Sequence, residues 1–335
     1  MMFENGSPRK ICWIRGTGSH EMVIKEEKLI MSKLCENRVV IVTGGARGIG
    51  REHCLMLAEN GAKVVVNDLG GARDGTGSGL GPADEVVQEI EAMGGEAIAN
   101  GDDVSDWEGA QRMINMAVEH FGDLTGLVNN AGILRDRMLV NMTEGEWDSV
   151  IQVHLKGTFA PARWAAAYWR DKVKSGEEVN ASIVNTTSVS GIYGNPGQTN
   201  YGAAKAGIAS FTVIAARELQ RYGIRVNCVA PGALTRMTED LGMGSASEES
   251  KAQMHPRYIA PIVTWLQSAE SADVTGRVFE ASGQLLAVAN GWHRGPAVDA
   301  VDDPNKIAEI ARQLVRDSQL NCGMDGQPYD GGLLG

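Results

Sequence analysis

Apolar runs of two kinds alternate along most of the chain. Residues 38–43 and 62–68 are nearly continuous in apolar, mostly β-branched residues, a pattern typical of strands buried on both faces of a parallel sheet. Longer runs such as 106–122 instead show the period of an amphipathic helix. Because strands and helices alternate from residue 38 to about 290, the pattern predicts an α/β fold, with a doubly wound, mostly parallel sheet and helices on both faces.

A glycine-rich turn follows the first predicted strand. The sequence GGARGIG, residues 44–50, leads into a helical pattern that begins at Arg51. In this context Gly44 permits a tight turn, and Gly48 and Gly50 let a pyrophosphate approach the backbone and the N–H groups at the helix start. The arrangement predicts a dinucleotide site in a single Rossmann-like domain.

The second predicted strand ends at Asp68, eighteen residues after Gly50. A carboxylate there can accept hydrogen bonds from the adenosine ribose and would repel a 2′-phosphate, so NAD is favoured over NADP. Arg47 in the loop complicates this prediction, because a basic residue could attract that phosphate. We give Asp68 more weight, since its repulsion is close and Arg47 can also serve the pyrophosphate.

A third constellation lies near the middle of the chain. Tyr201 and Lys205 are four residues apart in a run with helical character, so their side chains leave the same face of a helix. A tyrosine ionises only near pH ~10 unless a positive charge stabilises the phenolate, and Lys205 is placed to supply that charge. Ser188 ends a predicted strand over 181–187 and could hold the same substrate oxygen. This arrangement predicts a general acid/base for alcohol or ketone chemistry.

Composition narrows the class of partner. The 335 residues carry a formal charge of −11, which argues against nucleic acid or an anionic membrane surface, although a few local cations could still bind an anionic substrate. No apolar run approaches the ~18 residues of a membrane helix. The odd number of cysteines, without CxxC spacing, favours a reducing compartment, and we expect a cytoplasmic protein without a metal site.

The pattern also divides the chain. Residues 1–36 do not continue it, and we expect either a mobile N-terminal extension or translation from a start codon upstream of Met31. Residues 37–290 are predicted to form the Rossmann-fold domain. Residues 291–335 are predicted to be a C-terminal helical extension and tail, and their one amphipathic run could be a capping helix or a subunit contact.

These motifs resemble those of the short-chain dehydrogenase/reductase family. Ser188, Tyr201 and Lys205 are similar to its catalytic trio, and TGGARGIG follows its TGxxxGxG form. The run GIYGNPGQTNYGAAKAG, residues 191–207, is similar in particular to the (3R)-hydroxyacyl-CoA dehydrogenase region of peroxisomal multifunctional enzyme type 2. One departure is His154, where many members of the wider family place an asparagine of a proton relay. His154 could orient a water in the same way or be an ordinary helix residue.

The resemblance implies the residues that bind the cofactor. Asp103 and Val104 match the position that borders the adenine, and we choose Asn130 for a cofactor contact at the edge of the sheet. The expected cofactor-binding set comprises Gly44, Arg47, Gly48, Ile49, Gly50, Asp68, Asp103, Val104, Asn130, Tyr201, Lys205, Pro231, Gly232 and Thr235.

The resemblance also implies an activity, namely NAD-dependent oxidation of a secondary alcohol by a homo-oligomer. The substrate would be an acyl-CoA, as a 3-hydroxyacyl thioester, or a steroid alcohol such as a 17β-hydroxysteroid. We expect a lid over residues 233–252 and further substrate contacts within 255–295, where we interpret Trp292 as a packing residue. A non-catalytic NAD-binding sensor on the same fold is the competing hypothesis, which the intact Ser/Tyr/Lys set disfavours.

Overall fold

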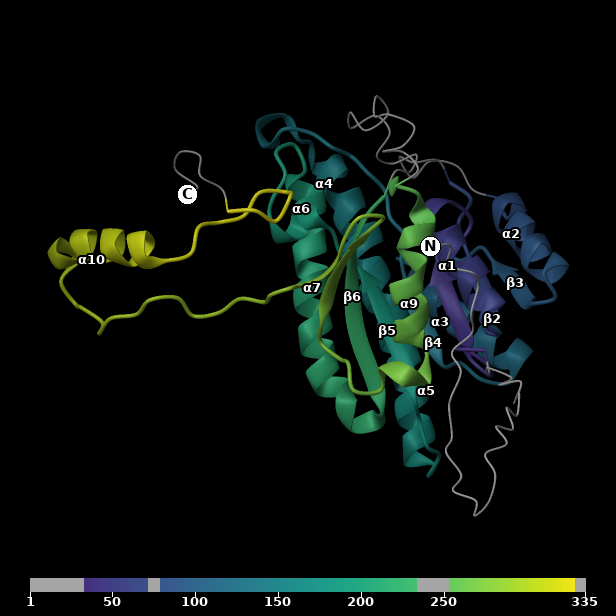
Figure 1. Cartoon of the computed structure of the whole chain (residues 1–335). Helices are drawn as coiled ribbons and strands as arrows, with labels where there is room; N and C mark the ends of the chain where they lie inside the picture. Colours follow the sequence, from purple (N-terminus) through teal and green to yellow (C-terminus); the bar gives the residue numbers. More distant parts are fainter. Residues whose placement is uncertain (1–32, 72–78, 234–252, 329–335) are drawn as a thin grey trace, which may run out of the picture. The chain divides into compact units, whose positions relative to one another are not determined.

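The central sheet is the frame of the protein (Figure 1). A computed structural model describes residues 33–71, 79–233 and 253–328. Within the unit that begins at Lys33, these residues form one eight-stranded sheet in the order β3-β2-β1-β4-β5-β6-β7-β8, in which only β8 runs antiparallel to its neighbour. The strands are β1 (Val39–Thr43), β2 (Lys63–Asn67), β3 (Glu96–Asn100), β4 (Gly126–Asn129), β5 (Ala181–Thr186), β6 (Ile224–Gly232), β7 (Val278–Ser282) and β8 (Leu286–Ala289).

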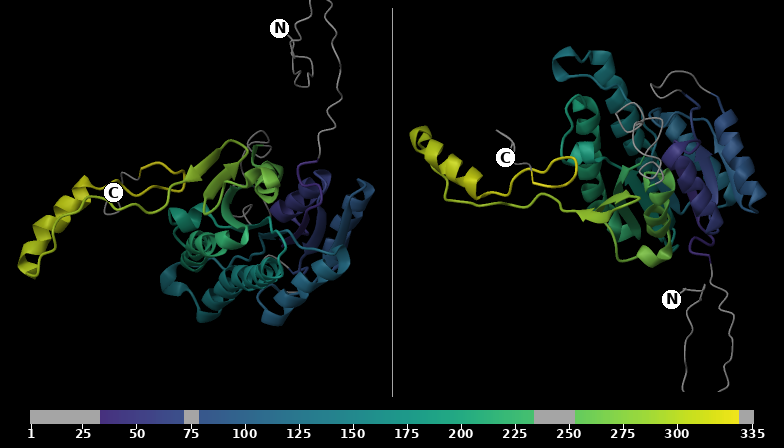
Figure 2. Two further views of the ribbon diagram at one scale, coloured as in Figure 1. Left: turned by 90° about the horizontal axis from the view of Figure 1, so that it is seen from below. Right: turned by 45° about the horizontal axis from the view of Figure 1, so that its top comes forward.

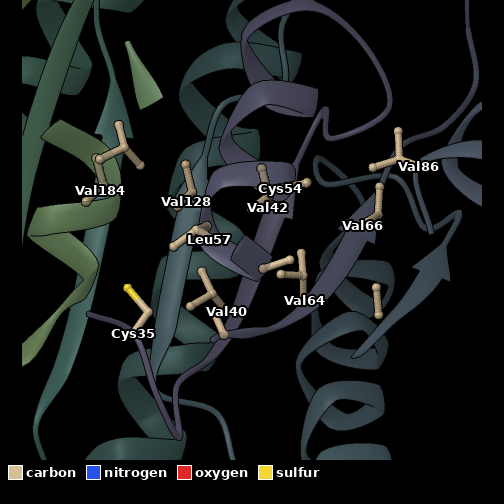
Figure 3. Close-up of a cluster of buried hydrophobic side chains, with 14 of the residues drawn as sticks. Cys35, Val40, Val42, Cys54, Leu57, Val64, Val66, Val86, Val128 and Val184 are labelled. Carbon is tan, nitrogen blue, oxygen red and sulfur yellow. The ribbon is translucent and has the colours of Figure 1, made fainter. Parts of the chain in front are cut away.

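Strand β1 shows why the apolar runs become buried strands. Successive side chains of a strand point to opposite faces, and both faces of this sheet are covered. Val40 and Val42 pack with Leu57 of helix α1 (Gly48–Glu59) on one side, as Figure 3 shows. Ile41 packs on the other side, in the cluster that contains Trp169 of helix α5 (Gly157–Lys174). Full burial of one such side chain stabilises the fold by roughly 1.5–3 kcal/mol.

Helices cover the two faces in separate groups. Helices α1, α2 and α9 contribute to the core cluster on the face of Val40, and α3, α5 and α7 contribute to the cluster on the face of Ile41. Figure 2 shows the second group, α3, α5 and α7, from two further directions. The helices are α1 (Gly48–Glu59), α2 (Gly81–Ala92), α3 (Trp107–Phe121), α4 (Glu144–Ile151), α5 (Gly157–Lys174), α6 (Val189–Ile192), α7 (Thr199–Leu219), α9 (Ala260–Gln267) and α10 (Pro304–Asp317).

The predicted fold class is confirmed, and two local predictions need correction. Helix α1 begins at Gly48, three residues before the predicted start at Arg51, so Gly48 and Gly50 belong to its first turn. Trp292 is 100% exposed and therefore does not pack against the described part of the chain. Its burial could not be judged locally, because an aromatic residue in an irregular segment gives no periodicity. Helix α10 has no buried residue.

The described residues contain no membrane-spanning helix and no cluster of metal-binding side chains. None of their helices is both long and apolar enough to cross a membrane. Across residues 33–71, 79–233 and 253–328 there is also no group of three or more His, Cys, Asp or Glu residues that could hold a metal ion.

Candidate active site

The strand order reverses between β1 and β4, and the loops that follow these strands lie together at the carboxyl edge of the sheet. Gly44 has a φ of +63°, and a Cβ on it would lie 2.9 Å from Cα of Ala131. A Cβ on Gly50 would lie 2.0 Å from the oxygen of Gly44. Only glycine fits these close approaches, which leave the backbone of the turn uncovered by side chains.

The start of α1 fits an anionic ligand. Arg47 precedes the helix with an extended backbone, no side chain caps the first turn, and that turn contains no acidic residue. The first N–H groups of a helix have no partner within the helix and carry partial positive charge. The turn over residues 44–50 can therefore hold the pyrophosphate of a dinucleotide.

Asp68 lies at the other side of this turn. Its carboxylate accepts hydrogen bonds from the main-chain N–H of Ala46 at 3.1 Å and of Gly70 at 2.8 Å. Arg47 reaches the same region, where its guanidinium donates to the oxygen of Gly71 at 3.2 Å. Asp68 and Arg47, the two residues on which the predicted preference between NAD and NADP depends, thus both lie beside the glycine turn. Each Asp68 oxygen keeps a lone pair that can still accept from a ribose hydroxyl.

Asn130 joins the loops after β1 and β4. Its side-chain nitrogen donates to the oxygens of Thr43 at 3.0 Å and Gly44 at 3.2 Å, and its main-chain nitrogen donates to the Thr43 hydroxyl at 2.9 Å. These bonds satisfy main-chain oxygens at the carboxyl edge of the sheet. The side chain therefore holds the glycine turn in place.

The remaining predicted cofactor residues lie on the same edge of the sheet or just beyond it. Asp103 follows β3 and accepts two hydrogen bonds at 2.8 Å from the backbone nitrogen and hydroxyl of Ser105. Val104 is buried beside Gly157, at the start of α5. Ile49 lies in the first turn of α1, and Pro231 and Gly232 end β6. Thr235 and most of the predicted lid fall outside the described residues.

The three residues with candidate acid/base chemistry lie close together. Tyr201 is in the first turn of α7, and the ammonium nitrogen of Lys205, one turn later, is 5.5 Å from the centre of its ring. Ser188 caps the short helix α6, and its hydroxyl lies near enough to the Tyr201 phenol to lower the pKa of that phenol. Lys205 donates to the main-chain oxygen of Thr186 at 2.7 Å. Ser188 and Lys205 are both buried, and Tyr201 is half-buried.

Burial dominates the protonation of this group. It raises the pKa of Tyr201 to about 12, while the hydrogen bond from Ser188 acts to lower it and the charge of Asp136 acts to raise it. Burial also lowers the pKa of Lys205 to about 8. The sequence argument expected Lys205 to depress the phenol pKa, and the protein alone does not show this. The physical reason is that desolvation of the phenol outweighs the attraction of an ammonium bound to Thr186.

His154 touches this group from the side. It lies in a π-helical turn, Gln152–Lys156, and its ring meets the Tyr201 ring edge to face at 5.1 Å. Its Nε2 contacts the main chain of Ile133, its Nδ1 has no partner among the described residues, and burial lowers its pKa to about 3. The ring is therefore neutral at physiological pH and fills the space over Gly132, where a Cβ would lie 2.3 Å from its Cε1.

Sequence reasoning missed several polar residues around the trio. Thr186, which receives the Lys205 bond, and Gln198 and Asp136, which bond to each other at 2.7 Å, gave no local signal because their partners are distant in sequence. Tyr193 is another. Its hydroxyl donates to Glu280 at 2.6 Å, and a Cβ on Gly326 would lie 3.5 Å from the same hydroxyl oxygen. Figure 1 shows the C-terminal segment returning to α6 at this place.

Comparison with known proteins identifies the family. The sequence model of the family described as short chain dehydrogenase matches residues 38–245, which is more than half of the chain. The chain belongs to the short-chain dehydrogenases. It is therefore an oxidoreductase of this family, acting on a hydroxyl group, and such proteins typically bind a nicotinamide cofactor on their Rossmann-type sheet.

Similar short-chain dehydrogenases narrow the subgroup. The hydroxyacyl-CoA dehydrogenase ChsB1 of Mycobacterium tuberculosis is 44% identical over 82% of this chain and 87% of its own length. The peroxisomal multifunctional enzyme type 2 of Mus musculus is 42% identical over 77% of this chain, which spans only 32% of that protein. The crystal structure of a short chain dehydrogenase from Mycobacterium avium is 46% identical, with a TM-score of 0.78 over 89% of this chain and 100% of that one. The resemblance to the dehydrogenase region of the multifunctional enzyme is thereby confirmed.

Proposed function

We propose that this dehydrogenase oxidises a 3-hydroxyacyl-CoA to the 3-oxoacyl-CoA with NAD as the hydride acceptor. The observation that carries the proposal is the approach of Tyr201 to the buried Ser188 and Lys205, in a protein whose glycine turn suits a pyrophosphate. The substrate class is supported by relatives that are named as hydroxyacyl-CoA dehydrogenase and as multifunctional enzymes of peroxisomes.

In the proposed reaction Tyr201 is the general base. Its phenolate oxygen takes the proton from the substrate hydroxyl, and Ser188 donates a hydrogen bond to the same substrate oxygen, which becomes the ketone oxygen. Bound NAD would accept the hydride from the carbinol carbon. Lys205 keeps a positive charge near the phenolate and would bind the nicotinamide ribose. Burial of Ser188 and Lys205 keeps water away from their side of the site, which strengthens each of these interactions.

The preference for NAD rests on Asp68. Its carboxylate is fixed by the N–H of Ala46, within the cofactor turn, and by the N–H of Gly70, so it cannot easily turn away from a 2′-phosphate. Arg47 is held near Gly71 and can serve the pyrophosphate. Among the remaining predicted residues, we propose Asp103 and Val104 for the adenine side, and Asn130, Pro231 and Gly232 for the nicotinamide side.

Substrate contacts are proposed for the surface around Tyr193. Its hydrogen bond to Glu280 links the segment after Ser188 to strand β7, and the described part of the C-terminal tail adds Gly326 to the same place. This surface lies next to the trio rather than at the cofactor turn. It therefore suits the acyl chain or thioester of a substrate whose hydroxyl meets Tyr201.

The experiment is a substrate panel followed by NADH absorbance. A 3-hydroxyacyl-CoA in both configurations, a 17β-hydroxysteroid and a simple secondary alcohol are each offered with NAD and with NADP. The proposal expects turnover of one 3-hydroxyacyl-CoA enantiomer with NAD, at a kcat/KM well above that for the steroid. Higher kcat/KM for the steroid would favour a hydroxysteroid dehydrogenase. NAD binding without turnover of any alcohol would favour the sensor.

We also propose a homo-oligomer, supported by exposed apolar side chains on neighbouring helices. Phe159 of α5 and Val213 and Ile214 of α7 are exposed, and exposed apolar side chains are common where copies of a chain associate. Light scattering on the purified full chain tests this, and a monomer at micromolar concentration would contradict it. A cytoplasmic location stays a prediction, which cell fractionation would check.

A further inference from the structure

A buried glutamine stands between the segment after β4 and the helix that Ser188 caps. Gln198 is only 4% exposed and lies just before α7. Its side-chain nitrogen donates to Oδ2 of Asp136 at 2.7 Å, and its side-chain oxygen accepts from the hydroxyl of Ser190 at 2.8 Å and from Asn195 at 3.0 Å. Each of the three bonds joins a donor to an acceptor, so both the nitrogen and the oxygen of the Gln198 amide have partners.

These partners leave Gln198 a single amide orientation. Turning the amide over would set its oxygen against the Asp136 carboxylate, which only accepts, and its NH2 against the NH2 of Asn195, which only donates. Asp136 is itself placed by the main chain, because Arg137 donates its N–H to the oxygen of Gly197 at 2.8 Å and pairs with Gln198 in an isolated bridge. The carboxylate therefore sets the direction of the amide.

Ser190 connects Gln198 to Ser188 through hydrogen bonds. Ser190 is 6% exposed, and its main-chain N–H donates to the hydroxyl oxygen of Ser188 at 3.1 Å. This bond occupies a lone pair of the Ser188 oxygen and leaves its proton for a second acceptor, such as Tyr201 or a substrate oxygen. Helix α6 has only four residues, so bonds from outside decide its position.

The polar chain beside the active site, in which Gln198 and Ser190 are buried and Asp136 is half-buried, has to be explained. Apolar residues of similar shape would avoid the desolvation of Asp136 and Gln198 and would often be as stable or more stable. We propose that Gln198 is a positioning residue, held in one amide orientation by Asp136, that fixes the catalytic hydroxyl of Ser188 through Ser190. The inference deepens the proposed function, on which it rests for the role of Ser188.

The test exchanges the two polar partners. In Gln198→Glu two carboxylates face each other, the bond to Asp136 is lost, and kcat for alcohol oxidation falls at least about tenfold. In Asp136→Asn the new amide can meet Gln198 with either its oxygen or its NH2, so the Gln198 amide is no longer held in one orientation and kcat falls, by less than in Q198E. The double variant D136N/Q198E restores every bond, because the new amide at position 136 donates to the new carboxylate at position 198, which still accepts from Ser190 and Asn195. Its kcat recovers to within about threefold.

Controls separate positioning from damage to the fold. Gln220→Glu adds the same charge at an exposed position near the end of α7 and leaves kcat unchanged. The Kd for NADH and the melting temperature of Q198E are compared with those of the original protein. If Q198E does not fold, Ser190→Ala is used instead, because it removes the Ser190 bond to Gln198 without adding a charge and lowers kcat by a similar factor.

A second measurement, the pKa of the Tyr201 phenol, needs no turnover. It therefore tests the inference even if the proposed function is wrong. The absorbance of the Tyr201 phenolate is titrated in the NAD complex, with Tyr201→Phe subtracted. The Ser188 hydrogen bond lowers the pKa of Tyr201, so Q198E and Ser190→Ala raise it and D136N/Q198E returns it. The inference is overturned if Q198E folds and keeps its kcat and phenol pKa, or if D136N fails to rescue a folded Q198E. Absence of turnover in the original protein, with the phenol pKa shifting as stated, contradicts only the proposed function.

Discussion

The ammonium nitrogen of Lys205 lies 5.5 Å from the centre of the Tyr201 ring and points to the main-chain oxygen of Thr186, at 2.7 Å. The cation is thus held by the end of β5 while it faces the ring from one helical turn away. Because burial lowers the pKa of Lys205 to about 8, its charge is lost as pH rises through that value. The charge state of Lys205 therefore sets an upper pH limit on the proposed chemistry.

The upper pH limit set by Lys205 is measured most directly in the direction of ketone reduction. Reduction requires a protonated Tyr201, whose pKa is about 12 in the protein alone, so the phenol remains protonated well above pH 8. The rate of reduction is expected to fall as pH rises through about 8, because Lys205 becomes neutral there. Lys205→Arg, whose charge persists, should move the fall to higher pH, while Lys205→Met should lower kcat by about a hundredfold or more at all pH values. A rate independent of pH from 7 to about 10 in the original protein would contradict this role.

The Asp68 carboxylate predicts the cofactor preference. In Asp68→Asn the side chain still accepts from one N–H of the turn but no longer repels a 2′-phosphate. The ratio of kcat/KM for NADP to that for NAD should rise about tenfold or more, the factor that corresponds to 1.4 kcal/mol. Asp84→Asn, an exposed position in the first turn of α2, serves as the control and should leave the ratio unchanged. An unaltered ratio in Asp68→Asn would remove the reason to prefer NAD.

The contact between Gly132 and His154 predicts a loss of stability. A Cβ on Gly132 would lie 2.3 Å from Cε1 of the buried His154 ring, so Gly132→Ala should lower the free energy of unfolding by about 1–3 kcal/mol. Gly145→Ala in α4, with nothing within 4 Å of its Cβ, should instead be neutral or stabilising by roughly 0.5–1 kcal/mol. Urea unfolding of both variants measures the difference. Adding His154→Asn should return part of the loss, and equal stabilities of the two alanine variants would refute the contact.

Two buried histidines predict an acid limit to stability. Burial lowers the pKa of His53 and of His154 to about 3 each, below the 6.5 of an exposed histidine. Between these values the unfolded chain binds protons that the folded chain does not, so stability is lost as pH falls from about 6.5 toward 3. The slope contributed by each histidine approaches roughly 1.4 kcal/mol per pH unit. His53→Gln should reduce this slope in urea titrations between pH 6 and 4, and an unchanged slope would show that His53 is accessible to protons in the folded state.

Local sequence patterns were sufficient to predict the helices and strands, but not the side-chain contacts between distant segments. The run over 38–43 predicted β1 because β-branched residues in succession suit a strand covered on both faces. The spacing of Tyr201 and Lys205 predicted their shared face because helical geometry is local. Asp136 and Gln198, in contrast, are 62 residues apart and meet only because the segment after β4 runs beside the start of α7. No local periodicity in the sequence indicates that Asp136 and Gln198 are in contact.

The protonation of the site was also beyond local reasoning. A lysine one turn from Tyr201 suggested a depressed phenol pKa, but the burial that raises it depends on all the elements packed around α7. The start of α1 at Gly48 was missed for a related reason. Glycine has poor helix propensity, and tertiary packing of the turn against Ala131 and Gly44 overrides it.

The most direct measurement of the central claim is the turnover of Tyr201→Phe, with the Kd for NADH determined on the same preparation. The phenyl ring keeps the contact with His154 and the shape of the site while removing the one oxygen that is proposed to take the substrate proton. We predict that kcat for 3-hydroxyacyl-CoA oxidation falls by about a thousandfold or more, with the Kd for NADH within about twofold of the original. A variant that binds NADH normally and retains most of its kcat would contradict the account.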